Sequence, residues 1–177
     1  PPGSIPSRLA LGSYTVEAWA RLNAGAGAGT VVRRQVGIGQ QNIWMGVEAA
    51  VGGTYRPYAR VTPATDTTHT GANDMIARVA AGQGLEPEIW YHLAATFDEA
   101  SGLLLLYVNG RRQADAVLSG GVMTHGVGPQ FTRVGEGWAG LIDEVRIWDR
   151  ARTADTIRQG MFSRVDMTLP GWAVTPT

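Results

Sequence analysis

Two neighbouring carboxylates, Asp143 and Glu144, are the residues whose type and position first suggest chemistry. They lie in residues 138–150, WAGLIDEVRIWDR, where alternating apolar and polar side chains predict a β-strand. Successive side chains of a strand point to opposite faces, so these two carboxylates cannot act together on one substrate. Retaining glycoside hydrolysis needs two carboxyl groups about 5–5.5 Å apart on one face. This pair therefore does not predict a hydrolase.

The other patterns that would suit hydrolysis are weak. The segment EPE (86–88) has the right spacing, but it carries a proline and lies in a predicted loop before the strand at 89–97. No Ser-His-Asp arrangement is indicated, because each of His69, His92 and His125 is isolated, outside any catalytic pattern. The chain is therefore not expected to be an enzyme, and a glucanase-like hydrolase is the least favoured function.

Asp143 poses a physical problem, because the alternation places it on one face with Leu141, Val145 and Ile147. An unpaired carboxylate among apolar groups costs several kcal/mol. Three arrangements would remove that cost. Asp143 can accept backbone N–H bonds from a loop such as GEGWAG (135–140), it can pair with an Arg or His92, or it can bind calcium. No dense oxygen cluster lies nearby, so the sequence favours the first two.

Calcium is the one cofactor that the sequence leaves open. It is a hard cation that takes six to eight oxygen ligands, more than one aspartate supplies. The long polar segment 62–75, TPATDTTHTGANDM, offers further oxygens. The candidate metal ligands are Asp143, Asp66, Asn73 and Asp74.

Ligand binding by a β domain commonly uses aromatic side chains near loops or edges. Four such residues are the candidates for ligand contact: Trp138, Tyr58, Trp44 and Tyr55. Trp138 and Tyr58 are preferred, because glycine or proline neighbours expose them. The alternative for each is a packing role, since Trp is mostly buried in small β domains.

The composition sets the class of protein. The 177 residues suffice for one domain with a substantial core, and 24 glycines suggest many turns. The formal net charge is zero, which argues against binding to nucleic acid or to anionic membranes. No apolar run approaches the roughly 18 residues of a membrane span, so no membrane insertion is expected. The absence of Cys excludes disulfides and thiolate metal sites.

The elements that must position these residues are short strands separated by turns. Alternation and turn residues predict strands at 13–22, 30–39, 42–51, 54–61, 75–80, 89–97, 103–108, 111–118, 131–135 and 141–148. The strand at 54–61 is expected at a sheet edge, because Pro57 cannot donate to a ladder. Asn109-Gly110 predicts a hairpin turn. Residues 152–162 predict one helix, capped by Thr153. The pattern indicates an all-β sandwich.

Three segments, YTVEAWARL, WYHLAATFDEASGLLLLYVNG and TRVGEGWAGLIDEVRIWDRART, together resemble a known family. The chain resembles a laminin-G-like jelly-roll domain of the concanavalin A-like lectin/glucanase superfamily over residues 10–160. The resemblance implies a two-sheet antiparallel jelly-roll sandwich of about six or seven strands a sheet, with one short C-terminal helix. It also implies a binding role, and calcium in many relatives. Members usually have a strand before YTVEAW, which residues 1–12 match poorly.

The sequence thus predicts three parts. Residues 1–10 are a linker or an incomplete first strand that another segment completes, residues 11–163 are the β-sandwich, and residues 164–177 are a linker. The opening PPGSIPSRL suggests the inside of a longer polypeptide. The expected function is non-catalytic recognition of carbohydrate or protein, at the cell exterior, the cell surface or a virion surface. The alternative is a structural or decoration module of a filament, fibre or virion, which assembles with neighbouring subunits or domains and has no small ligand.

Overall fold

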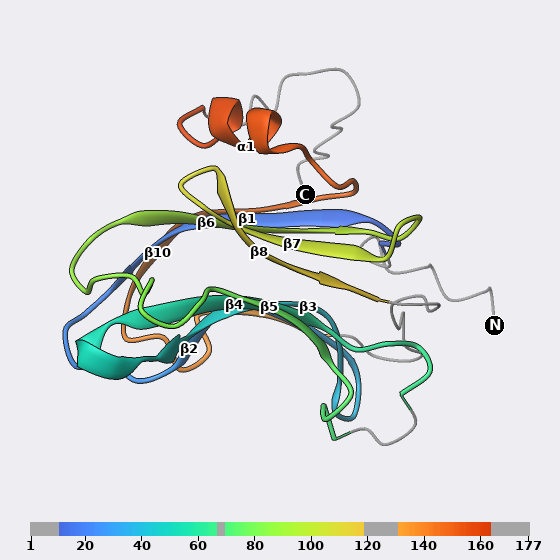
Figure 1. Ribbon diagram of the computed structural model, residues 1–177, viewed down its shortest axis with the longest axis horizontal. Coiled ribbons are helices and arrows are strands. Elements are labelled where there is room, and N and C mark those ends of the chain that lie inside the picture. Colours follow the sequence, from blue (N-terminus) through green and yellow to red (C-terminus); the bar gives the residue numbers. More distant parts are fainter. Residues whose placement is uncertain (1–10, 67–69, 119–130, 164–177) are drawn as a thin grey trace, which may run out of the picture.

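The structure, a computed structural model, describes residues 11–66, 70–118 and 131–163. Two antiparallel five-stranded sheets face each other across one core, as Figure 1 shows. The predicted fold class, an all-β concanavalin A-like sandwich with one short helix, is confirmed. In the described part each sheet has five strands, fewer than the resemblance implies. The predicted linkers at 1–10 and 164–177 lie outside the described residues, and no described helix is long and apolar enough to cross a membrane.

We name the two sheets A and B and give their strands in spatial order. Sheet A consists of β10 (Gly140–Trp148), β1 (Tyr14–Leu22), β6 (Tyr91–Asp98), β7 (Leu103–Val108) and β8 (Arg111–Val117). Sheet B consists of β5 (Met75–Arg78), β4 (Tyr55–Val61), β3 (Gln40–Ala49), β2 (Gly29–Gly37) and β9 (Phe131–Val134). A 3₁₀ turn, η1 (Val51–Gly53), joins β3 to β4, and a helix, α1 (Ala154–Gly160), follows β10.

The core lies between the sheets and follows the predicted alternation. In β1 the side chains of Tyr14, Val16, Ala18, Ala20 and Leu22 are all buried in it. The Leu run of β7 divides between two environments, because Leu104 and Leu106 enter the core while Leu105 packs against a second apolar cluster under α1. The second cluster explains why an apolar run of four residues fits one strand.

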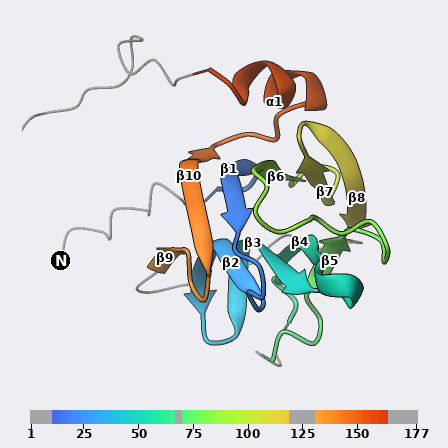
Figure 2. The same cartoon turned by 90° about the vertical axis from the view of Figure 1, so that its left-hand side faces the viewer.

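Helix α1 covers the outer face of sheet A, the face that points away from sheet B (Figures 1 and 2). The predicted cap is confirmed, since the Thr153 side chain accepts a hydrogen bond from the Thr156 N–H. Ile157 is fully buried against Ala94 and Tyr107. The predicted Asn109-Gly110 turn brings β8 beside the helix, and a Cβ on Gly110 would lie only 2.2 Å from Cγ of Arg158.

The expected edge position of the strand at 54–61 is wrong. Strand β4 lies inside sheet B, between β3 and β5. The Pro57 carbonyl accepts from the Val79 N–H, so the missing N–H of Pro57 points to the same side. There the partner strand β5 has already ended at Arg78. A proline is tolerated here because β5 ends before it reaches the position opposite Pro57, so no regular strand hydrogen bond needs the missing N–H.

The expected face of Asp143 is also wrong. Strand β10 has a β-bulge opposite Ala18, where the register moves from Glu17↔Arg146 to Trp19↔Asp143. Glu144 adopts a positive φ of 51° within it. One extra residue reverses the alternation, so Ile142 and Ile147 pack on the core while Asp143 is exposed. The Asp143 carboxylate accepts the Glu144 N–H at 2.8 Å.

Candidate functional site

The outer face of sheet A is occupied by a buried charge cluster under α1. Glu17 is fully buried, and its Oε1 accepts from Trp148 Nε1 and from a guanidinium nitrogen of Arg152, both at 2.9 Å. Arg146 lies 3.7 Å from the same oxygen, and His92 Nε2 lies 3.8 Å from Oε2. The positive charges of two arginines thus compensate the negative charge of one buried carboxylate.

His92 stays neutral in this cluster. Burial, together with the positive charges of Arg146 and Arg152, lowers its pKa to about 4. The Trp19 ring lies 5.4 Å from the His92 ring and from the Phe162 ring. The cluster therefore combines aromatic rings with fixed charges beneath a helical cover.

The C-terminal end of α1 is tied to this face by side-chain donors. Arg146 donates to the carbonyls of Gly160 and Ser163 at 2.9 and 2.6 Å, and Trp19 Nε1 donates to the Met161 carbonyl at 2.8 Å. The Gly160 carbonyl also accepts the Ser163 N–H at 3.0 Å, and the side chains of sheet A supply the other donors to these three carbonyls. This part of the outer face of sheet A is closed to a ligand as long as α1 stays docked.

The outer face of sheet B carries no such cover of described elements. It is the face that points away from sheet A, and its ribbon arches with the hollow side outward in Figure 1. The strand register places Arg33 beside Trp44, and Arg133 beside Arg33. Because Met45 pairs with Ala59, Arg60 lies on the other side of Trp44. A row Arg133, Arg33, Trp44, Arg60 therefore crosses four strands of the sheet.

Trp44 forms the centre of that row. The guanidinium carbons of Arg33 and Arg60 lie 4.8 and 4.3 Å from the centre of its ring, one reaching in from each neighbouring strand. Its Nε1 donates to the Thr30 hydroxyl at 3.1 Å. Tyr58 stands beside the row, 6.1 Å from the Trp44 ring, and burial raises the pKa of its phenol.

Three carboxylates accompany the arginines of this face. Asp74 pairs with Arg60, and it also accepts the Thr62 hydroxyl at 2.6 Å. Glu136 pairs with Arg33 at 3.0 Å and Arg133 at 3.1 Å. Glu48 pairs with Arg78 at 2.9 Å and Arg56 at 3.6 Å. Each of these last two carboxylates therefore serves two guanidinium groups.

Of the four aromatic residues predicted to contact a ligand, the structure brings Trp44 and Tyr58 together. Tyr55 lies in the core, where its hydroxyl donates to the Ala26 carbonyl at 2.9 Å. Trp138 is partly buried against the core beside Gly29, whose Cβ position lies 2.9 Å from the Trp138 ring. The four residues thus do not form one surface.

The four residues predicted to bind calcium also divide. Asn73 Nδ2 donates to Asp66 Oδ1 at 3.0 Å, and Asp74 in the same loop is neutralised by Arg60. Asp143 lies on β10, the edge strand of the other sheet. Within residues 11–66, 70–118 and 131–163, no three side chains of His, Cys, Asp or Glu come together to hold a metal ion. The described donors do not fit calcium as they stand, and the calcium site stays a prediction.

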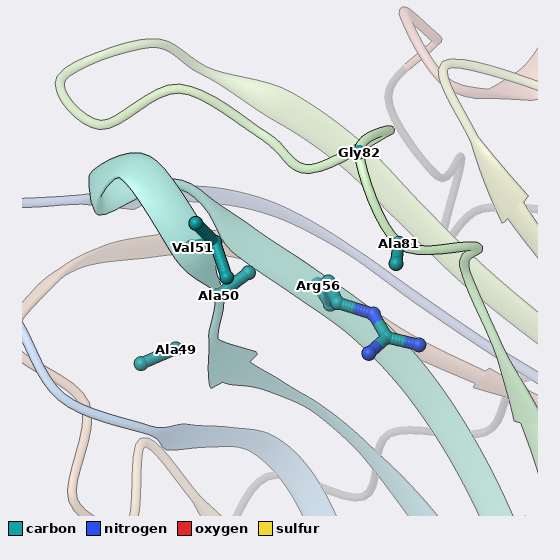
Figure 3. Close-up of a pocket in the computed structure, with 6 residues that line it drawn as sticks. All are labelled: Ala49, Ala50, Val51, Arg56, Ala81 and Gly82. Carbon is teal, nitrogen blue, oxygen red and sulfur yellow. The ribbon is translucent and has the colours of Figure 1, made fainter.

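A depression of about 560 Å³ opens at one end of sheet B beside η1 (Figure 3). It is lined by Ala49, Ala50, Val51, Arg56, Ala81 and Gly82. Arg56 is the one charged side chain among them, and its Nε donates to the Val79 carbonyl at 3.0 Å. Small apolar walls with one guanidinium offer few polar groups to orient a ligand. The depression therefore adjoins the arginine-rich face without forming a site of its own.

Comparison with known proteins identifies the family to which this architecture belongs. A laminin G family model, described as the concanavalin A-like lectin/glucanases superfamily, matches residues 4–158. The chain belongs to this superfamily. The search of curated proteins gives no match.

Solved structures of this superfamily fold are similar at low sequence identity. A candidate carbohydrate-binding protein from Bacteroides ovatus is 22% identical, with a TM-score of 0.59, covering 91% of this chain and 42% of that one. The CBM40 domain of a Ruminococcus gnavus sialidase, bound to α2,3-sialyllactose, is 12% identical with a TM-score of 0.59, covering 84% and 82%. A botulinum neurotoxin DC binding domain, in complex with rat synaptotagmin II, is 12% identical with a TM-score of 0.54, covering 86% and 36%. The chain thus spans well under half of two of these three structures.

Sequence reasoning missed the arginines of sheet B and the Glu17 cluster. Nothing in the local sequence around Arg33 or Arg60 sets them apart from other outward residues of a strand, and only the register reveals that they flank Trp44. The sequence did contain an indication for Glu17, because Glu17 and Trp19 are two residues apart in the strand predicted at 13–22 and therefore share one face. Its partners Trp148 and Arg152 are more than a hundred residues away, and no local pattern links them.

Proposed function

We propose that this chain is a non-catalytic recognition module that binds carbohydrate on the outer face of sheet B, as part of a larger extracellular or surface protein. The observation that carries the proposal is the row in which Arg33 and Arg60 flank Trp44, with Tyr58 beside it. Sugar-binding surfaces combine aromatic groups with fixed hydrogen-bond donors. This face offers both on neighbouring strands of one rigid sheet.

The similar structures support a recognition role. One of them is the sialidase CBM40 domain bound to a sialylated sugar, and another is the toxin binding domain bound to a protein receptor. Sandwiches of this fold thus present binding surfaces to glycans and to proteins. We favour a glycan for this chain because its open face is built from rigid, hydrogen-bonding side chains.

The carboxylates of the same face support a non-catalytic role. Glu48, Asp74 and Glu136 each form an ion pair with arginine. Each of these carboxylates is therefore engaged by guanidinium groups of the same face, and it suits the positioning of those arginines.

A second candidate, an assembly module, is favoured by one observation. The edge strands β9 and β10 lie on the same side of the sandwich (Figure 2) and carry exposed apolar side chains. These are Phe131, Val134, Leu141 and Val145. Exposed apolar groups on edge strands suit contacts between subunits.

The test is a glycan-array screen of the purified protein, once with calcium and once with EDTA, followed by titration of the best ligand. We expect Trp44→Ala to weaken binding by about tenfold, because the two arginines lose their support. The control is Trp90→Ala, a partly exposed tryptophan before β6. Thermal melting confirms that both variants fold.

The outcomes separate the candidates. Binding that EDTA abolishes would support the calcium prediction. Binding that survives EDTA would indicate that the polar segment 62–75 has a structural role and holds no calcium needed for binding. An equal loss in both tryptophan variants would contradict the proposed surface. The absence of any glycan ligand would contradict the proposed function and favour the assembly module.

A further inference from the structure

We infer that the ligand of the outer face of sheet B is an acidic oligosaccharide, one that carries carboxylate or sulfate groups. The inference rests on the proposed function and specifies its ligand class. Two observations support it: the excess of positive charge on this face, and the two guanidinium groups that lie over the ring of Trp44.

The face has an excess of positive charge on a chain whose formal net charge is zero. Its described charged residues are five arginines and three carboxylates: Arg33, Arg56, Arg60, Arg78, Arg133, Glu48, Asp74 and Glu136. The excess of two positive charges is therefore a local feature of this sheet. A surface of one sign attracts ligands of the other sign.

The excess is concentrated where two arginines share one carboxylate. Glu48 pairs with both Arg56 and Arg78, and Glu136 pairs with both Arg33 and Arg133. One carboxylate neutralises one guanidinium group, so each of these clusters retains a positive charge. The side chains of Arg78 and Arg133 are 39% and 49% exposed, which leaves them accessible to a ligand.

The ring of Trp44 is the second observation. A neutral sugar gains from stacking on an open aromatic face, but here guanidinium groups from both neighbouring strands lie over the ring. The tryptophan therefore holds two arginines in place on the sheet. Guanidinium groups have five N–H donors in a planar fork that matches carboxylate and sulfate oxygens. The row thus suits an anion better than a neutral sugar ring.

The length of the row indicates an oligosaccharide. Arg133, Arg33, Trp44 and Arg60 lie on four adjacent strands, β9, β2, β3 and β4. At about 4.8 Å between neighbouring strands, the row is about 14 Å long. One sugar unit with one acidic group would contact only part of it, while a chain with an acidic group on successive units would contact several arginines.

The experiment is calorimetric titration with three hexasaccharide probes and one single-stranded DNA 12-mer. The sugar probes are a neutral cello-oligosaccharide, an oligogalacturonate with carboxylates, and a heparin-derived sulfated oligosaccharide. We expect an acidic probe to bind at least about tenfold more tightly than the neutral one. The two acidic probes decide between carboxylate and sulfate.

Two matched variants localise the binding. Arg78→Gln on sheet B and Arg112→Gln on β8 of sheet A each remove one exposed arginine that pairs with one carboxylate. They change the net charge equally. We expect Arg78→Gln to weaken binding of the acidic probe by about fivefold and Arg112→Gln to leave it unchanged.

The outcomes distinguish this inference from the proposed function. Equal affinity for neutral and acidic probes would overturn the inference and leave the proposed function standing. Binding to none of the sugars would overturn both. Equal losses in the two variants, or equal affinity for the DNA, would show general charge attraction and would also overturn the inference.

Discussion

Glu17 shows how much a single buried charge can matter in this fold. Its buried carboxylate faces Arg146, Arg152 and Trp148 beneath α1, and Arg146 also pairs with the exposed Glu144 at 2.8 Å. A buried ion pair adds little net stability, but breaking one leaves an uncompensated charge. The cost of its removal should therefore far exceed that of a surface ion pair.

We predict that Glu17→Gln lowers the free energy of unfolding by about 3–5 kcal/mol, because Arg152 loses the carboxylate with which it pairs and Arg146 keeps only the exposed Glu144. The matched control is Glu88→Gln, which breaks the exposed pair with Arg21 and should cost under about 1 kcal/mol. Denaturant unfolding of the three proteins measures both values. Similar costs for the two variants would contradict the role given to Glu17.

His92 should make the stability depend on pH. Its pKa is 6.5 in the unfolded chain and about 4 in the folded one, so between these values only the unfolded chain binds the proton. Stability is therefore full above about pH 6.5 and falls as the pH drops towards 4. The loss from this one group is on the order of 3 kcal/mol.

The measurement is the free energy of unfolding at several pH values for the wild type and for His92→Gln. The variant should lack this contribution, so its stability should fall less steeply, by up to about 1.4 kcal/mol per pH unit. Parallel curves for the two proteins would show that His92 titrates normally in the folded state.

At the scale of single residues, the sequence drew attention to Asp143 but did not predict its surroundings. Asp143 was expected to face the core and to need a loop N–H, an Arg, His92 or calcium, but it is exposed and accepts the N–H of its own neighbour Glu144. The reason is a bulge, which inserts one residue and reverses the alternation beyond it. Periodicity alone cannot locate such an insertion.

At the scale of elements, α1 and the β7–β8 turn form one contact. Gly110 has a φ of 69° at the tip of that turn, and its Cβ position would lie 2.2 Å from Arg158 Cγ and 3.3 Å from its Cα. A side chain there would have to displace the helix as well as adopt a left-handed conformation. The turn and the helix therefore restrict each other.

We predict that Gly110→Ala destabilises the protein by about 2–3 kcal/mol, from backbone strain and from displacement of α1. Gly25→Ala is the matched control, because Gly25 has a φ of 75° and no atoms within 4 Å of its Cβ position. It should cost about 1 kcal/mol. Equal melting temperatures for the two variants would show that the contact with Arg158 contributes nothing.

The strands themselves could be predicted closely, because each is short, alternating and bounded by turn residues. Their order could not. The edge position expected for β4 followed from Pro57, yet a neighbour that ends early removes the objection to a proline. The row through Trp44 depends on that order, so the candidate site could be predicted only as separate aromatic residues.

At the scale of the whole molecule, the two outer faces differ in what covers them. The outer face of sheet A is occupied by α1, while the arginine-rich face of sheet B is left open by the described elements. Strand β10 forms one edge of sheet A, and its bulge interrupts the regular row of backbone hydrogen-bonding groups with which a strand of another molecule would pair. This arrangement suits a module that binds a ligand as a single copy.

We therefore predict a monomer of 18.8 kDa in light scattering at concentrations of about 10–100 µM. The alternative is self-association through the exposed apolar residues of β9 and β10. A larger mass that Leu141→Glu reduces to the monomer would favour the assembly module instead.

The Glu17 cluster also constrains the order in which the protein can fold. Glu17 lies in β1, and its partners Trp148 and Arg152 follow 131 and 135 residues later. During synthesis, β1 therefore emerges from the ribosome long before the cations that make its burial tolerable. Contacts between such distant residues slow folding, on a scale of milliseconds to seconds for β-sandwiches. The nascent chain must stay open at this strand until residues 148–152 have been made, and chaperones would be needed most in that interval.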